Sequence, residues 1–244
     1  MKHVQTARGD SPRLAFPPAR IAASLSALDR AHRVRARAAA DALVVCLRKF
    51  IDAGQVPLSA TVGQTATPQS WQHYQPADAM AIDGRPGALH YYYHAHPTPG
   101  SHTAEHGHFH LFAQLGADEE GVARYTHLIA IGVDARGLPI RLFTTNRWVT
   151  DETWLHADRL IALAEKIADS RASHNDPVDG WLRAQLGVFA PQIAGLLRHR
   201  DRRMAARRKD GGRPGLFEDR RMHVVSQCLV SVERQLTALD HVIH

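Results

Sequence analysis

Between residues 88 and 150 the chain alternates apolar and polar positions, which is the pattern of β-strands. Residues two apart on a strand share a face, so the alternation predicts one buried and one polar side. We expect two hairpins, with arms at 89–96 and 106–114 and at 124–133 and 138–149. The sequence therefore predicts a small antiparallel sheet, in which Gly137 closes the second turn in a left-handed conformation.

Outside this segment, apolar residues recur every three to four positions, which is typical of amphipathic helices. The stripe over 19–54 predicts one long N-terminal helix, or two in line, ended by Gly54. In the region 151–244 we expect three further helices, which cover 154–170, 178–189 and 217–242. Pro191 breaks or restarts the second of them.

These elements predict an α+β protein, in which the sheet packs against the long N-terminal helix and a C-terminal helical bundle. Residues 1–18 are polar and end in prolines, so we expect them to be disordered or extended. Residues 19–244 form a single domain in this prediction. The stretch 55–87 lacks a period and predicts a long loop, which is either a lid over the polar side of the sheet or an inert surface loop.

The chain has 244 residues, of which 44% are hydrophobic, and this is enough for a domain with a substantial core. No apolar run approaches the roughly 18 residues of a membrane span, and the start of the sequence lacks the pattern of a signal peptide. We therefore expect a cytoplasmic protein without a membrane partner. Cys46 and Cys228 are far apart and predict free buried thiols, so any metal would be bound through nitrogen and oxygen.

Histidine is concentrated in the stretch 89–114, which contains seven of them. On one side of the first arm lie His90, Tyr92, His94 and His96. The same side of the second arm carries His106, His108, His110 and Phe112. Pairing His96 with His106, or with His108, brings the two histidine sides together, whereas a slip of one residue would turn the imidazoles towards the core. The apolar side of the hairpin therefore selects a register that gathers the histidines.

Imidazoles and a carboxylate on adjoining strands suit a divalent transition metal such as zinc, iron or copper. The predicted ligands are His94, His96, His108 and His110. Glu105 is a candidate fifth ligand or general base, and Tyr92 could hydrogen-bond or donate a proton to a bound ligand. Three more histidines are candidates for additional ligands or for partners of the ligands: His106, His90 and His127. Alternation places His127 with aliphatic residues, so we expect it in the core.

The function that this pattern favours is that of a metal-dependent enzyme acting on a small molecule, through hydrolysis with zinc or oxygen chemistry with iron or copper. A non-catalytic metal-binding or sensing protein would use similar ligands with closed coordination. Without a metal, the same histidines would form a solvated polar face, a pH-responsive surface or a hydrogen-bonded polar core.

Two other segments carry candidate binding residues. Asn146, Arg147 and Trp148 lie at a strand end, where side chains often face a pocket, and they are either substrate-binding or structural. The basic run 198–209 is a candidate nucleic-acid interface, in a chain whose formal charge is +6. It has no interleaved aromatic residue and no DNA- or RNA-binding motif, which favours the simpler interpretation of a solvated helix end.

The sequence YYYHAH at 91–96, combined with EHGHFH at 105–110, resembles the signature block of an uncharacterised proteobacterial family of unknown function. The resemblance covers roughly residues 85–155 and implies no activity. The ligand types are also similar to those of cupin metal sites, but eight residues separate His96 from Glu105, which departs from the cupin spacing. We therefore do not assign the chain to the cupins.

Overall fold

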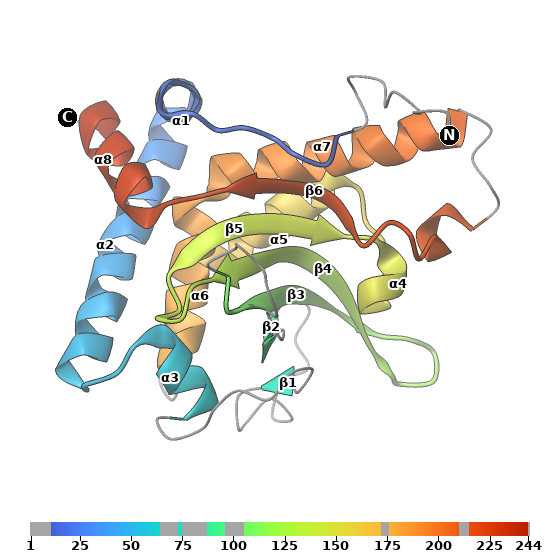
Figure 1. The fold of residues 1–244 in the computed structure, drawn as a ribbon, viewed down its shortest axis with the longest axis horizontal. Helices are drawn as coiled ribbons and strands as arrows, with labels where there is room; N and C mark the ends of the chain where they lie inside the picture. The colour runs from blue at the N-terminus through green and yellow to red at the C-terminus, as the bar shows by residue number, and fades with distance from the viewer. Residues whose placement is uncertain are drawn as a thin grey trace, which may run out of the picture.

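A six-stranded sheet runs through the part of the chain that the structure describes, and each neighbouring pair of strands is antiparallel (Figure 1). The computed structural model describes residues 11–63, 73–74, 87–95, 105–171, 176–209 and 215–243. In order across the sheet the strands are β1 (His73–Tyr74), β2 (Leu89–Ala95), β3 (Gly107–Ala117), β4 (Ala123–Val133), β5 (Pro139–Thr145) and β6 (Val224–Leu229). The predicted antiparallel sheet is confirmed, and its two hairpins are β2–β3 and β4–β5.

Helices cover one side of this sheet, so the predicted α+β class is also confirmed. They are α1 (Pro18–Ser26), α2 (Arg30–Asp52), α3 (Pro57–Val62), α4 (Arg147–Thr150), α5 (Ala157–Asp169), α6 (Pro177–Val188), α7 (Ala190–Lys209) and α8 (Val232–Ile243), with a 3-10 turn η2 (Leu216–Glu218). In the view of Figure 1, α5, α6 and α7 lie behind the sheet, and α2 packs against α6. None of the helices in the described residues is both long and apolar enough to span a bilayer.

The predicted N-terminal helix over 19–54 consists of two helices that are not in line. In Figure 1, α1 is seen end-on while α2 runs down the side of the molecule. The break falls at Asp29, whose carboxylate accepts the backbone N–H of His32 at 2.8 Å and starts a new helix there. The predicted loop 55–87 contains α3 and β1, and residues 64–72 and 75–86 of that proposed lid lie outside the described residues.

The helix predicted over 217–242 is wrong in its first half, which forms η2 and β6 before α8 begins. The spacing of the apolar residues there fits a helix, but β6 pairs with β5, and Cys228 lies opposite Leu142. β5 has an open edge without β6, and the β-branched pair Val224 and Val225 suits a strand. Tertiary pairing therefore overrides the local helical pattern. Residues 12–14 extend along the same strand, where Leu14 N–H donates to Gln227 O at 2.8 Å.

The apolar side of the sheet packs on α5, α6 and α7. Tyr93, Phe109, Leu111 and Ile129 are fully buried on this side. The ring of Phe109 meets that of Trp181 on α6 at a centroid distance of 5.5 Å. Burying side chains of this size contributes roughly 1.5–3 kcal/mol each. The histidines lie on the opposite side of the same strands, so apolar burial decides which side is left for chemistry.

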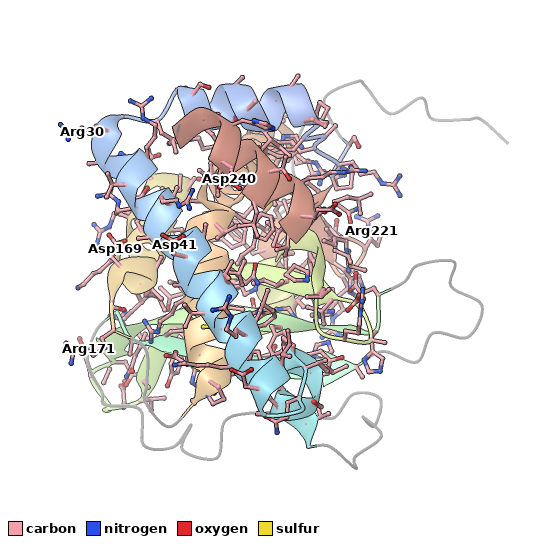
Figure 2. All side chains as sticks on the ribbon, turned by 90° about the vertical axis from the view of Figure 1, so that its left-hand side faces the viewer. Arg30, Asp41, Asp169, Arg171, Arg221 and Asp240 are labelled. Carbon is pink, nitrogen blue, oxygen red and sulfur yellow. The ribbon has the colours of Figure 1, made fainter. Side chains whose placement is uncertain are left out.

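Helices α2 and α8, which lie near the two ends of the chain, complete the helical layer outside α6. Arg37 on α2 donates to Asp41 at 3.2 Å and to Asp240 on α8 at 2.9 Å. Figure 2 labels Asp41 on α2 and Asp240 on the neighbouring α8. These pairs are exposed to solvent, so they orient α8 more than they stabilise it.

We expect Gly187→Ala to destabilise the protein, although alanine normally stabilises a helix interior by about 1 kcal/mol relative to glycine. A Cβ at Gly187 on α6 would lie 2.5 Å from Cβ of Ala39 on α2, so the two helices would have to separate. The free energy of unfolding, measured by urea titration, should fall in the single variant. The double variant Ala39→Gly/Gly187→Ala removes the clash and should recover most of that loss, and an unchanged loss would contradict this packing.

Candidate metal centre

The register between β2 and β3 sets His94 directly opposite His108. In the same ladder Tyr92 lies opposite His110, so both pairs point to the histidine side of the sheet. The predicted pairing of His96 with His106 belongs to this same register, but His96 lies outside the described residues, and the observed ladder ends at Ala95 and Gly107. The pairing that gathers the histidines is therefore the one that forms.

Three imidazoles converge at this point of the sheet and could hold a metal ion. One ring nitrogen from each of His94, His108 and His110 lies within 4.8 Å of the other two. Nε2 of His108 is 3.0 Å from Nε2 of His110. Metal–nitrogen bonds of about 2.0–2.1 Å in a tetrahedral site place two ligand nitrogens about 3.3 Å apart, so this spacing fits a shared ion. His108 and His110 are buried, and His94 is half-buried.

Glu105 fixes the orientation of His108 from the side away from the cluster. Its Oε1 lies 3.5 Å from Nδ1 of His108. Arg141 on β5 holds both carboxylate oxygens, through Nε at 2.6 Å and Nη2 at 2.7 Å. The carboxylate sits over Gly132 of β4, where a Cβ would lie 2.6 Å from Oε2. Glycine at this position therefore makes the room in which Glu105 reaches both His108 and Arg141.

The surroundings of Glu105 keep it ionised. Burial alone would raise its pKa, but the hydrogen bonds from His108 and Arg141 and the charge of Arg141 outweigh burial and lower the pKa to about 2. A carboxylate with this pKa, and with both oxygens on a guanidinium, is a weak base. The geometry thus favours Glu105 as a group that orients His108, and its predicted role as a general base or fifth ligand stays a prediction.

His127 lies on the histidine side of the sheet, and its expected place among the aliphatic residues is wrong. It is buried, as predicted, but a β-bulge changes its side. Leu111 pairs with Ile129 and Phe112 pairs with His127, which leaves Leu128 as an extra residue in β4. Nε2 of His127 consequently lies 3.1 Å from Nδ1 of His110.

The ring of His127 is held in a dry environment. Its Nδ1 is 3.3 Å from Oγ1 of Thr145 on β5. Burial, together with the electrostatic effects of Arg200 and His108, lowers the pKa of His127 to about 3. The imidazole is therefore neutral at physiological pH, with one nitrogen as a donor and the other as an acceptor.

Glu152, in the turn after α4, holds the bulge. Its Oε2 accepts the backbone N–H of His127 at 2.8 Å and the hydroxyl of Thr126 at 3.3 Å. Burial raises the pKa of Glu152 to about 7, although the charge of Arg200 and these hydrogen bonds oppose the shift. A buried carboxyl group therefore positions the residue that contacts His110.

The other predicted residues near the cluster occupy different places. Tyr92 stacks on His94 with ring centroids 5.9 Å apart and lies 5.1 Å from the ring of His110, and burial raises its pKa to about 12. His90 packs on the ring of Tyr125 at 5.0 Å. His106 Nδ1 lies 2.7 Å from the hydroxyl of Tyr93, which belongs to the apolar side. Of Tyr92, His90 and His106, only Tyr92 has its ring next to the imidazoles of His94 and His110 in the described residues.

Asn146, Arg147 and Trp148 contact the segment 216–223. Asn146 Nδ2 donates to Leu216 O at 3.0 Å, and its Oδ1 caps α4. Arg147 pairs with Glu218, and Trp148 Nε1 donates to Asp219 O at 3.0 Å. These contacts give the three residues a structural role, which is to hold the segment that precedes β6 in place. Their predicted role in substrate binding stays a prediction.

The basic run 198–209 forms the second half of α7 and is only partly the solvated helix end that we expected. Arg200 and Arg203 are buried, at 1% and 5% exposure. Arg200 donates to Leu155 O and lies over the ring of Trp154 at 4.0 Å, and Arg203 donates to Val225 O. Arg200 and Arg203 therefore have structural roles, and fewer positive charges of the run are left to contact a phosphate backbone.

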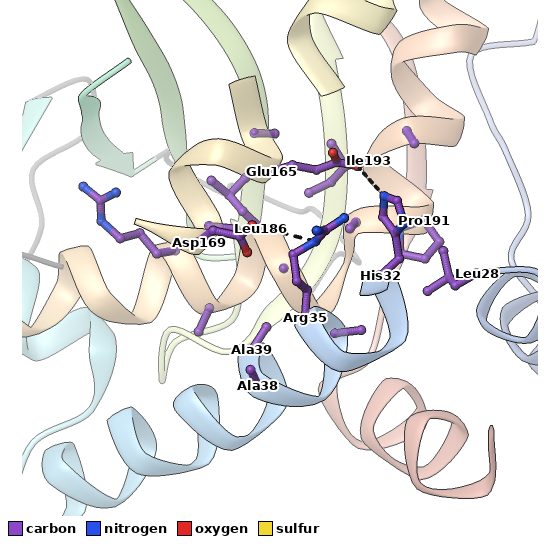
Figure 3. A pocket seen from close by; sticks show the side chains of 18 of the residues that line it. Leu28, His32, Arg35, Ala38, Ala39, Glu165, Asp169, Leu186, Pro191 and Ile193 are labelled. Carbon is purple, nitrogen blue, oxygen red and sulfur yellow. Dashed lines mark ion pairs between the residues drawn. The ribbon is translucent and has the colours of Figure 1, made fainter. Parts of the chain in front are cut away.

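A cavity of about 1060 Å³ lies between α2 and helices α5, α6 and α7, away from the imidazoles. His94, His108 and His110 are not among its lining residues. Ion pairs cross it from α2 to α5, with His32 3.8 Å from Glu165 and Arg35 3.7 Å from Asp169 (Figure 3). Small side chains such as Ala38 and Ala39 of α2 also line this cavity. The cavity is therefore a helix-packing groove and not the site of the histidine chemistry.

Four residues of the site were not predicted from the sequence: Arg141, Gly132, Thr145 and Glu152. Arg141 lies on the polar side of a predicted strand, between Ile140 and Leu142, so alternation could have identified it. Glu152 has no such signal, because it reaches His127 only after the chain has turned back beyond α4.

We expect Glu152→Gln to remove a pH-dependent part of the stability. Because the folded pKa of about 7 lies above the reference value of 4.5, the neutral carboxyl group stabilises the fold below pH 4.5, and this contribution is lost as the pH rises to 7. The free energy of unfolding of wild type, relative to that of Glu152→Gln, should fall by on the order of 3 kcal/mol across this window. Urea titrations from pH 4.5 to 8 measure it, with Glu120→Gln at an exposed turn as the control. A constant difference would contradict the assignment.

One protein family, described as a domain of unknown function (DUF6969), matches residues 37–230 through its family model. No curated protein and no solved structure matches the chain. The expected resemblance to an uncharacterised family is therefore confirmed, whereas the proteobacterial distribution and the role of the histidine block as its signature stay predictions. Because the match covers well over half of the sequence, the chain belongs to the family of this domain of unknown function, DUF6969.

Proposed function

We propose that this protein is a metal-dependent enzyme that acts on a small molecule, with the ion bound by His94, His108 and His110. The observation that carries the proposal is the convergence of three imidazole nitrogens within 4.8 Å on the side of the sheet away from the helices. Imidazole ligands suit zinc, iron and copper, so the donor set favours a transition metal over calcium or magnesium.

The partners of the ligand rings support a metal over an ordinary polar cluster. Nε2 atoms of His108 and His110 face each other, while each Nδ1 faces a different group, Glu105 or His127. Histidine ligands of metals usually donate their second ring N–H to a carboxylate or another acceptor, which fixes the tautomer and the ring orientation. Both buried histidines have such a group near Nδ1, which is Oε1 of Glu105 at 3.5 Å for His108 and Nε2 of His127 at 3.1 Å for His110.

Among the described residues the cluster offers three protein ligands, which is the number that catalytic zinc sites use to leave a fourth position open to water or substrate. A bound ion would supply Lewis acidity to a water molecule or to a substrate oxygen. The chain's own groups then orient the reactants: Glu105 and Arg141 hold His108, and Tyr92 lies beside His94 and His110. With a pKa of about 12, the Tyr92 hydroxyl stays protonated and can donate a hydrogen bond to a bound ligand.

Protein purified without a histidine tag should contain about one equivalent of a transition metal by elemental analysis. His108→Ala and His94→Ala should each lose it, because each removes one of three ligands. The matched control is His90→Ala, which lies on β2 with His94 but packs on Tyr125, and it should keep the metal. Stoichiometric metal in both ligand variants, or a metal-free wild type that takes up none of zinc, iron(II) or copper(II), would refute the site.

An exchangeable coordination position separates an enzyme from a closed metal-binding protein. We expect azide to shift the visible absorption of the cobalt(II)-substituted protein in a saturable manner, because the anion replaces a non-protein ligand at the open position. His90→Ala should show the same titration. A cobalt spectrum that azide leaves unchanged would support the non-catalytic metal-binding function instead.

A further inference from the structure

A continuous chain of polar groups crosses the buried side of the cluster. It begins at the carboxylate of Glu105, which faces Nδ1 of His108. It passes from His108 Nε2 to His110 Nε2 over 3.0 Å, and from His110 Nδ1 to His127 Nε2 over 3.1 Å. It ends at Thr145, whose Oγ1 is 3.3 Å from His127 Nδ1. His108, His110, His127 and Thr145 are each at most 6% exposed, so these groups are shielded from solvent.

Without a metal, the carboxylate at one end determines where the protons lie. Both oxygens of Glu105 accept N–H groups of Arg141, so the carboxylate can only accept, and the tautomer of His108 that matches it has its proton on Nδ1 and accepts at Nε2. His110 must then donate from Nε2, which leaves its Nδ1 as an acceptor for the Nε2–H of His127. The Thr145 hydroxyl completes the chain by donating to His127 Nδ1. All donors point from Thr145 towards Glu105.

We propose that metal binding reverses the inner half of this chain, and that His127 is the positioning residue that accepts the Nδ1 proton of His110. This inference rests on the proposed metal site. An ion that takes the Nε2 lone pair of His110 requires the proton of that ring to be on Nδ1. Nε2 of His127 must then accept it, and the proton of His127 moves to Nδ1.

The proton count balances in this change. His110 and His127 each lose an Nε2–H bond and gain an Nδ1–H bond, and the Thr145 hydroxyl turns from donor to acceptor. No proton enters or leaves the chain. The reversal needs an acceptor that faces Nδ1 of His110, and Nε2 of His127 lies there at 3.1 Å.

The bulge in β4 places His127 where it can accept the proton of His110. Regular alternation from Ile131 and Ile129 would send His127 to the apolar side, and the extra residue Leu128 sends it to His110. Glu152 accepts the backbone N–H of His127 within the bulge at 2.8 Å. Bulges often re-aim a side chain next to a functional site, and this one is held by a buried carboxyl group.

Zinc affinity of three variants tests the role of His127. His127→Leu removes the acceptor and should weaken zinc binding by about 10–100-fold in a competition titration with a chromophoric chelator. His127→Gln keeps an acceptor oxygen near Nε2 and should restore the affinity to within about threefold of wild type. The matched control is His90→Leu on the same side of the sheet, which should bind zinc as wild type does. Wild-type affinity in a folded His127→Leu protein would overturn the proposal.

Nitrogen-15 NMR of the wild-type protein gives a test that does not depend on the variants folding. Long-range 15N–1H correlations should show His110 and His127 as Nε2–H tautomers without zinc and as Nδ1–H tautomers with zinc, while His108 stays Nδ1–H. Unchanged tautomers on zinc binding would refute the reversal alone. If the wild type binds no zinc at all, the proposed metal site fails and this inference fails with it, so the two failures are distinguishable.

Discussion

Antiparallel pairing of β2 with β3, in the register that opposes His94 and His108, is the constraint on which both sides of the sheet depend. Side chains on a strand alternate strictly, so one choice of register places Tyr93, Phe109 and Leu111 under the helices and the imidazoles on the other side. Burial of these three apolar side chains contributes roughly 5–9 kcal/mol, which is comparable to the whole stability of a typical domain. A slip of one residue would forfeit that energy. The histidine cluster is thus specified by the hydrophobic core behind it.

The polar side of the sheet has to satisfy its own groups, because most of them are removed from water. A buried polar group without a partner is costly, and a fully connected network is stable and rigid. Arg141 neutralises Glu105, Glu105 orients His108, and Glu152 holds the backbone of His127. The imidazoles are therefore held in place by the protein's own groups, an arrangement that would lower the cost of forming a metal site.

Aromatic rings surround this network. Phe143 meets the ring of His108 at 4.9 Å, Phe112 meets that of His127 at 5.2 Å, and Tyr92 lies against His94 and His110. Such a shell lowers the local dielectric and controls the access of solvent to bound groups. The cluster is therefore enclosed by aromatic rings and is not a solvated polar face.

Local sequence patterns were sufficient to predict the strands that carry the histidine cluster. Alternation over 88–150 predicted two antiparallel hairpins and placed His94, His108 and His110 on one side, because the period of two is a property of the strand backbone itself. The same pattern contained Arg141 on the polar side, at a strand position where its role could have been suspected. Composition also indicated a core large enough to select this register.

Contacts between distant parts of the chain decided the rest. One extra residue, Leu128, moved His127 to the other side of the sheet, and Glu152 holds that bulge from beyond the next hairpin. The pairing of β6 with β5 overrode an apolar spacing that fits a helix. In the basic run 198–209, Arg200 and Arg203 are buried and stabilise the fold instead of facing solvent. No short window of sequence encodes these outcomes, because each depends on which unpaired edge or buried polar group another segment can satisfy.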